Sequence, residues 1–121
     1  MKRTIKFRGK DVFTETWRYG DLVHNLKVTT TGLEPRTMVG GYKVIPGTVC
    51  QFTGIKDIEG NEVWEGDILD GRLKGEVVFT YGTFALHPLD CNKKEVFAPL
   101  YYFRLGDETL DLKVIGNKFD K

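Results

Sequence analysis

Two stretches of the chain repeat one order of residue types, and this repeat limits the possible folds more than any other feature of the sequence. The first runs from Phe7-Arg8-Gly9-Lys10-Asp11 to Trp17-Arg18-Tyr19-Gly20-Asp21-Leu22-Val23. The second runs from Phe52-Thr53-Gly54-Ile55-Lys56-Asp57 to Trp64-Glu65-Gly66-Asp67-Ile68-Leu69. We call each copy a Gly-Asp module. Two copies are too few for a solenoid, so they predict a duplicated hairpin, packed copy against copy or around a barrel.

Each module is predicted to form strand, turn, strand, turn and strand. In the second, Asp57 precedes Gly60-Asn61, which favours a hairpin because Asp accepts hydrogen bonds from turn N–H groups while Gly and Asn tolerate positive φ. We therefore interpret the Gly and Asp residues as a structural turn motif rather than as metal ligands. The motif comprises Gly20, Asp21, Gly54, Asp57, Gly60, Gly66 and Asp67.

Glycine and aromatic residues predict a mainly β chain of short antiparallel strands and hairpins, with at most short helical turns. The 14 glycines suit tight turns, and the aromatic residues, 12% of the chain, suit half-buried strands. No window shows a sustained helical period with caps.

The length of 121 residues predicts a single domain over 1–121. We place the first module at about 5–25, a linking excursion at about 30–47, and the second module with a barrel at about 48–117. Within the excursion, residues 30–41 are rich in Thr and Gly. We interpret them as a mobile loop or as an arm that reaches a neighbouring subunit.

The charge balance argues against a strong general attraction to nucleic acid or to an anionic membrane. The chain has 18 Lys and Arg and 17 Asp and Glu, a net charge of +1. No apolar run follows the basic first residues, so we expect neither a signal peptide nor a membrane span, and we expect a cytoplasmic protein. Cys50 and Cys91 form no CxxC pair and are expected to be reduced and buried.

No catalytic constellation emerges from the sequence, so we expect no enzyme, no catalytic residue, no cofactor and no metal. The chain has no serine and only two histidines, His24 and His87, which argues against a nucleophilic triad. These histidines, Asp21 and Asp67 lack the spacing of ligands on a helix or in a zinc knuckle. Phosphate-loop and dinucleotide fingerprints are absent. A hydrolase that uses Asp21, Asp67 or His24 is the distant alternative.

Basic and aromatic residues are interleaved in the first module, and this pattern suggests an alternative function. Basic residues beside Phe7, Trp17 and Tyr19 can grip phosphates while the rings stack on bases. The alternation in Lys6-Phe7-Arg8 is also typical of a strand with aromatics inside and cations in solvent, and we favour that interpretation. The candidate nucleic-acid contacts are Lys6, Arg8, Lys10 and Arg18.

A long motif runs Gln51-Phe52-Thr53-Gly54-Ile55-Lys56-Asp57 and continues as Gly60-Asn61-Glu62-Val63-Trp64-Glu65-Gly66-Asp67-Ile68, after the lead-in Ile45-Pro46-Gly47-Thr48-Val49. It resembles the YopX family of phage and prophage proteins. The similarity extends to residues 5–10 and 114–117, although Trp64 stands where Tyr is usual and Cys50 where Gly or Met is common. The resemblance implies a mostly β fold with a small SH3-like barrel, oligomeric assembly and no recognised catalytic residues, and it leaves the biochemical function open.

These observations predict an uncharacterised accessory protein of phage or prophage origin in the cytoplasm of a bacterial host. We expect a non-enzymatic homo-oligomer with a structural or interaction role. Aromatic residues such as Trp17, Tyr101 or Phe103 are expected at its subunit interface because they are numerous for so small a core. A nucleic-acid-binding module with an SH3-like barrel is the alternative.

Overall fold

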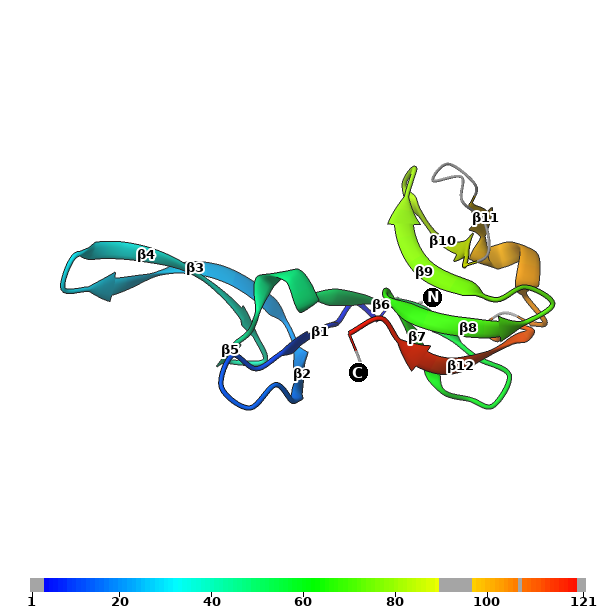
Figure 1. The fold of residues 1–121 in the computed structure, drawn as a ribbon, viewed down its shortest axis with the longest axis horizontal. Coiled ribbons are helices and arrows are strands. Elements are labelled where there is room, and N and C mark those ends of the chain that lie inside the picture. The colour runs from blue at the N-terminus through cyan, green and yellow to red at the C-terminus, as the bar shows by residue number, and fades with distance from the viewer. Residues whose placement is uncertain (1–3, 90–96, 107, 120–121) are drawn as a thin grey trace. The chain divides into compact units, whose positions relative to one another are not determined.

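A computed structural model describes residues 4–89, 97–106 and 108–119 and confirms a mainly β chain (Figure 1). The chain divides into two compact units, which we call the N-terminal unit (Thr4–Gln51) and the C-terminal unit (from Phe52 onward). The strands form antiparallel sheets, and the helical elements of the described residues are two short 3-10 turns. Across these residues, no helix is both long enough and apolar enough to cross a membrane.

The N-terminal unit contains the first module and a long hairpin. Its elements are β1 (Phe7–Lys10), β2 (Trp17–Gly20), β3 (Leu22–Thr29), β4 (Gly32–Val39), β5 (Tyr42–Lys43) and the 3-10 turn η1 (Pro46–Thr48). β1 pairs with β2 and with the first residues of β6 (Cys50–Lys56). β3 and β4 pair along their whole length, whereas β5 joins only the last two residues of β4. The outer part of this hairpin is therefore a two-stranded ribbon (Figure 1). We call residues 22–39 the arm.

Residues 30–41, for which we expected a mobile loop or an arm, form the turn and the second strand of this hairpin. Each residue of β4 from Gly32 to Val39 is paired with a residue of β3. The pairing of the two backbones therefore holds this strand in place, although it has few large apolar side chains. The segment is regular structure rather than irregular loop.

The C-terminal unit holds the second module and a five-stranded sheet in the order β11-β10-β9-β8-β12. Its elements after β6 are β7 (Glu62–Trp64), β8 (Asp67–Gly71), β9 (Gly75–Thr80), β10 (Thr83–Pro88), β11 (Ala98–Pro99), the 3-10 turn η2 (Leu100–Phe103) and β12 (Leu112–Asn117). Buried aliphatic side chains from these elements and from residue 110 form one core around a single aromatic ring. The core residues are Val63, Leu69, Val77, Leu86, Leu100, Phe103, Leu110 and Leu112.

The predicted SH3-like barrel is not confirmed. In the part of the chain that the structure describes, β11 and β12 are the end strands of the sheet, and no ladder joins them. Barrel closure requires strands whose tilt and stagger agree around the ring. β11 has only two residues, and the register between β12 and β8 shifts between Val114 and Gly116. Over the described residues the sheet is therefore open.

A close approach of two glycines fixes the base of the arm. Gly20 ends β2 and Gly40 follows β4, and a Cβ on Gly20 would lie 2.9 Å from the Cα of Gly40. A Cβ on Gly40 would collide with the carbonyl oxygen of Tyr19. Both glycines also have positive φ, 143° and 60°. Glycine is required here for two reasons, the missing side chain and the backbone conformation.

We predict that Gly40→Ala destabilises the fold more than Gly41→Ala. Gly41 lies in the same turn with φ 88°, yet an added Cβ would meet nothing within 4 Å, so the substitution costs only backbone strain of about 1–2 kcal/mol. Gly40→Ala adds the collision, for a further cost of about 1–3 kcal/mol. Urea denaturation of both variants measures the difference in free energy of unfolding. Equal losses would show that the close approach contributes nothing.

Candidate functional site

The register of the arm places four apolar side chains on one face. Directly opposed residues of an antiparallel pair share a face, and successive residues of a strand alternate between faces. Leu26 is opposite Pro35, and Val28 is opposite Leu33, two positions further toward the tip. All four therefore point to the same side of the ribbon. We call Leu26, Val28, Leu33 and Pro35 the apolar arm face.

The opposite face of the outer ribbon is polar and supplies partners for its own groups. Nε of Arg36 donates a hydrogen bond to Oδ1 of Asn25 at 2.5 Å, across the two strands. Lys27 lies opposite Glu34, a favourable pairing of unlike charges. This face is stable in water without a partner, and the difference between the two faces makes the arm amphipathic.

The apolar arm face is largely exposed within the N-terminal unit. Val28 is 79% exposed, Leu33 64% and Leu26 57%. Nearer the base, the β4 side of the same face is buried, because Thr37 is 8% exposed and Val39 is fully covered, whereas His24 on β3 is exposed. Two-stranded ribbons are marginally stable alone, and contiguous exposed apolar side chains mark interaction sites. The outer half of this face is thus a candidate interaction surface.

A hollow of about 430 Å³ adjoins the apolar arm face on its base side. Its walls include His24, Leu26, Pro35 and Thr37 from the arm and Val44 from the segment after β5. Nδ1 of His24 lies 3.4 Å from the hydroxyl oxygen of Thr37. The lining also contains polar and charged residues, namely Asn25, Glu34, Arg36 and Lys43. His24, considered above as a catalytic base, therefore lies in a hollow of mixed polarity on the arm.

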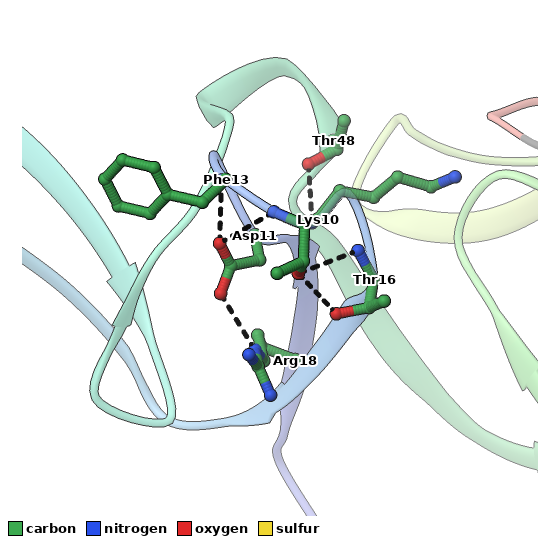
Figure 2. Close-up of polar contacts among 7 residues, drawn as sticks. Lys10, Asp11, Phe13, Thr16, Arg18 and Thr48 are labelled. Carbon is green, nitrogen blue, oxygen red and sulfur yellow. Dashed lines mark hydrogen bonds and ion pairs between the residues drawn. The ribbon is translucent and has the colours of Figure 1, made fainter.

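Asp11 organises the turn between β1 and β2 in the first module (Figure 2). The N–H groups of Phe13 and Thr14 donate to its Oδ1 at 2.8 and 3.3 Å, and Nε of Arg18 donates to its Oδ2 at 3.0 Å. The hydrogen bond from Phe13 is the main cause that lowers the pKa of Asp11; burial opposes it, and Arg18 and Thr14 add to it. Arg18 also stacks its guanidinium 3.8 Å from the centre of the Tyr42 ring.

Two other candidate nucleic-acid contacts gather on one aromatic ring. The guanidinium of Arg8 lies 4.3 Å from the centre of the Trp17 ring, and Nζ of Lys10 lies 5.2 Å from it. Arg8 is itself 8% exposed, and Lys6 is partly buried. The structure thus brings Arg8 and Lys10 together around Trp17, while Arg18 makes its ion pair with Asp11. Each of these contacts within the unit competes with a phosphate for the same cation.

The second module uses Asp57 in the same way, with one more connection. The N–H groups of Glu59 and Asn61 donate to its Oδ1 at 2.9 and 2.7 Å, and Nδ2 of Asn61 lies 3.3 Å from its Oδ2. The N–H of Val114 in β12 donates to Oδ2 at 3.0 Å. Asp57 has no exposed surface. Its carboxylate therefore ties the β6–β7 turn to β12 in the interior of the unit.

The hydrogen bonds to Asp57 decide its charge state. Burial is the largest single influence and raises the pKa, but the bonds from Val114, Asn61 and Glu59 together outweigh it, so the pKa lies below its usual value. A buried carboxylate that accepts several N–H groups remains charged at neutral pH. This supports a structural role for Asp57.

The second Asp of each module, Asp21 in the first and Asp67 in the second, makes different contacts. Asp67 is buried and accepts hydrogen bonds from the Trp64 N–H at 2.8 Å and from Nδ2 of Asn117 at 2.9 Å. Asp21 is exposed, and its main-chain oxygen accepts a bond from the Gly40 N–H at 3.1 Å. Within the described ranges, no three His, Cys, Asp or Glu side chains are grouped so that they could hold a metal ion. The motif glycines with positive φ are Gly20, Gly54, Gly60 and Gly66.

The three aromatic residues suggested for a subunit interface have different environments. Phe103 belongs to the core of the C-terminal unit, so its assignment to an interface was wrong: its ring is already covered within the unit. Trp17 is partly buried under Arg8 and Lys10. Tyr101 is 60% exposed, with its ring centre 4.7 Å from that of Tyr102.

The structure describes one of the two cysteines, Cys50. Cys50 is buried, and its thiol donates to the Thr48 carbonyl oxygen at 3.3 Å. Cys91 lies outside the described residues.

Sequence reasoning missed the apolar arm face. Leu26 and Val28 alternate with Asn25 and Lys27, which is a signal for an amphipathic strand. This alternation alone does not define the surface. Leu33 lies on the same side as Val28 only because of the register between the two strands. A search for alternation on both sides of the turn at residues 30–31 would have found the surface.

The fold and this surface define a small all-β protein with a projecting amphipathic hairpin. The chain belongs to the YopX family, since the family model described as YopX protein matches residues 6–121. A comparison with curated proteins finds no match.

We predict that Asp57→Asn lowers the free energy of unfolding by about 2–4 kcal/mol, because an amide cannot accept all the N–H groups that now meet the carboxylate. Asp70→Asn is the matched control. Its carboxylate is exposed and accepts one bond, from the Gly71 N–H, so its effect should stay within about 0.5 kcal/mol.

The same pair of variants tests the pH dependence. Because the folded pKa of Asp57 is lowered, its contribution to stability is present above the unfolded pKa of about 3.9 and is lost as pH falls through the folded value. The gap between the wild type and Asp57→Asn should therefore shrink as pH falls below about 4. Urea denaturation at a series of pH values measures it. A gap independent of pH would contradict the charged role of Asp57.

Proposed function

We propose that this protein is a non-enzymatic interaction protein that associates with copies of itself through the apolar arm face. The observation that carries the proposal is the contrast within one ribbon: Val28 and Leu33 lie 79% and 64% exposed on one face while the opposite face pairs its own polar groups. In this role it is an accessory protein of a phage or prophage that acts in the host cytoplasm.

The energetics favour a reversible association. Complete burial of a Val or Leu side chain contributes about 1.5–3 kcal/mol, so covering the outer arm contributes several kcal/mol per copy. Association costs about 4–15 kcal/mol in lost translational and rotational freedom. The two terms are of similar size, so any association through this face is weak and reversible.

Nucleic-acid binding is the second candidate function, and the placement of Arg8 and Lys10 around the Trp17 ring supports it. It ranks behind self-association because the guanidinium of Arg8 is buried and that of Arg18 is held by Asp11. A phosphate would have to displace these contacts. The apolar arm face, in contrast, requires no rearrangement before it can be covered.

We predict that Val28→Glu abolishes self-association without unfolding the monomer. Val28 is 79% exposed, so the substitution should change the free energy of unfolding by less than about 0.5 kcal/mol while it places a charge in the proposed interface. Light scattering with size-exclusion chromatography, over a range of protein concentration, measures the mass of both proteins. The wild type should increase in mass with concentration, and Val28→Glu should remain a monomer.

Val23→Glu is the matched control for this experiment. It introduces the same residue in the same strand, but Val23 points to the opposite face and is 46% exposed. It should associate like the wild type. A wild type that stays monomeric at millimolar concentration would refute the proposed function, and equal losses in both variants would refute the assignment to this face.

A further inference from the structure

The hollow of about 430 Å³ beside the base of the arm is a feature separate from the apolar arm face. Residues from both faces of the ribbon line it, together with residues of the segment 43–46. The Val44 N–H donates to the Thr37 carbonyl oxygen at 3.0 Å, whereas the next N–H, of Ile45, donates to the Lys10 carbonyl oxygen at 2.8 Å. The hollow therefore lies where this segment leaves β4 and turns toward β1.

Three basic side chains, one from each strand of the sheet β3-β4-β5, meet at this hollow. They are His24, Arg36 and Lys43. Among the described residues, Glu34 is the acidic member of the lining. The two permanent cations and one carboxylate leave an excess of one positive charge, before any contribution from the histidine. A concave surface with such an excess attracts an anion.

The guanidinium of Arg36 is held in a fixed orientation. Its Nε donates to Oδ1 of Asn25 at 2.5 Å, which uses one of its five N–H donors. Its terminal nitrogens have no protein acceptor among the described residues. A guanidinium positioned through Nε presents the remaining donors as a planar fork, and this geometry matches a carboxylate. Arg36 is thus prepared to receive an anion without first losing its bond to Asn25.

The other two basic groups also keep donors for a ligand. Nζ of Lys43 lies 3.8 Å from Oε1 of Glu34, too far for a hydrogen bond, and the two side chains are 38% and 55% exposed. Exposed ion pairs of this kind contribute little, so the ammonium can turn toward a bound anion. Nδ1 of His24 lies 3.4 Å from the Thr37 hydroxyl oxygen, which leaves Nε2 as the ring nitrogen for a ligand.

The remaining wall of the hollow is carbon. It is formed by Val12, Leu26, Pro35, Val44 and Pro46. Sites for small molecules combine apolar walls with a few polar groups and typically occupy about 300–1,000 Å³. A bare inorganic ion would leave this carbon surface in contact with water, whereas a ligand with an apolar body would cover it.

We infer that the hollow binds a small organic anion, a carboxylate on an apolar body, with the carboxylate on Arg36 and Lys43. One negative charge matches the charge excess of the lining, and the apolar body rests on the carbon wall. The site lacks the tip residues Val28 and Leu33. It therefore goes beyond the proposed function and does not depend on self-association.

NMR titration of the full-length ¹⁵N-labelled protein at low salt tests this site. Benzoate is the probe, and benzamide, which has the same ring and a similar shape but no charge, is the matched control ligand. We expect benzoate to cause saturable shifts in the amide signals of residues 24–26, 36–37 and 43–44. Benzamide should bind at least about tenfold more weakly, because it lacks the charge-assisted hydrogen bonds. Inorganic phosphate should also bind more weakly than benzoate.

Variants assign the binding to the named cations. Arg36→Gln removes the charge and keeps an amide that can still donate to Asn25, and it should weaken benzoate binding at least about tenfold. Lys43→Gln should weaken it several-fold. Lys27→Gln is the matched control, because it removes the same charge from the same ribbon at a position outside the lining, and its affinity should stay within about twofold of the wild type.

The same titrations in Val28→Glu separate this site from the proposed function. Benzoate should bind that variant as it binds the wild type, and self-association that fails while benzoate still binds would refute the proposed function alone. Equal affinities for benzoate and benzamide, or no shifts up to the solubility limit of benzoate, would overturn the anion site. Tighter binding of phosphate would overturn the need for an apolar body. Equal losses in Lys27→Gln and Arg36→Gln would show a general charge attraction in place of a site.

Discussion

The buried carboxylate of Asp57 is the interaction on which the C-terminal unit depends most. It joins a hairpin turn to Val114, 57 residues further along the chain, by accepting N–H groups from both segments. A buried charge is tolerated only when its oxygens are saturated with hydrogen bonds, so the turn and β12 must adopt their positions together. The first module repeats this device with Asp11, where the Arg18 side chain takes the place of the distant N–H. In both modules, therefore, the repeated Asp stabilises a turn by accepting its N–H groups.

The N-terminal unit has no comparable core and relies instead on local constraints. Gly20 and Gly40 allow the backbone of β2 to meet the base of the arm, and Asp11 holds the turn between β1 and β2. Beyond that base, β3 and β4 have only each other. A ribbon of this kind gains little from its own burial, so an apolar face on its outer half is a cost to the monomer that a partner can remove.

The turns and the mainly β character could be predicted from the sequence, whereas the pairing of strands that are distant in the sequence could not. The turns at Asp11 and Asp57 follow from residue types that hydrogen-bond within a few positions, and the mainly β character follows from glycine and aromatic content. The SH3-like barrel depended on pairing between distant strands, which composition does not specify, and it was not confirmed. Residues 30–41 were interpreted as a mobile loop or an arm because they are rich in Thr and Gly, and their strand is recognisable only from its pairing with β3. The candidate surface was missed for the same reason, since only the register reveals that Val28 and Leu33 share a face.

The register of β3 and β4 decides which side chains share a face. The turn at the tip, which sets this register, therefore helps to determine the apolar arm face. The Thr29 hydroxyl donates to the Gly32 carbonyl oxygen at 2.9 Å, and Gly32 has φ 135°, so the connection between the strands has one preferred geometry. A slip of one residue would pair Val28 with a residue of the polar face and would divide the apolar arm face between both sides of the ribbon. The base, fixed by Gly20 and Gly40, opposes the same slip from the other end. The apolar arm face therefore depends on constraints at both ends of a two-stranded ribbon, and these constraints explain why so exposed a hairpin keeps a regular register over eight pairs.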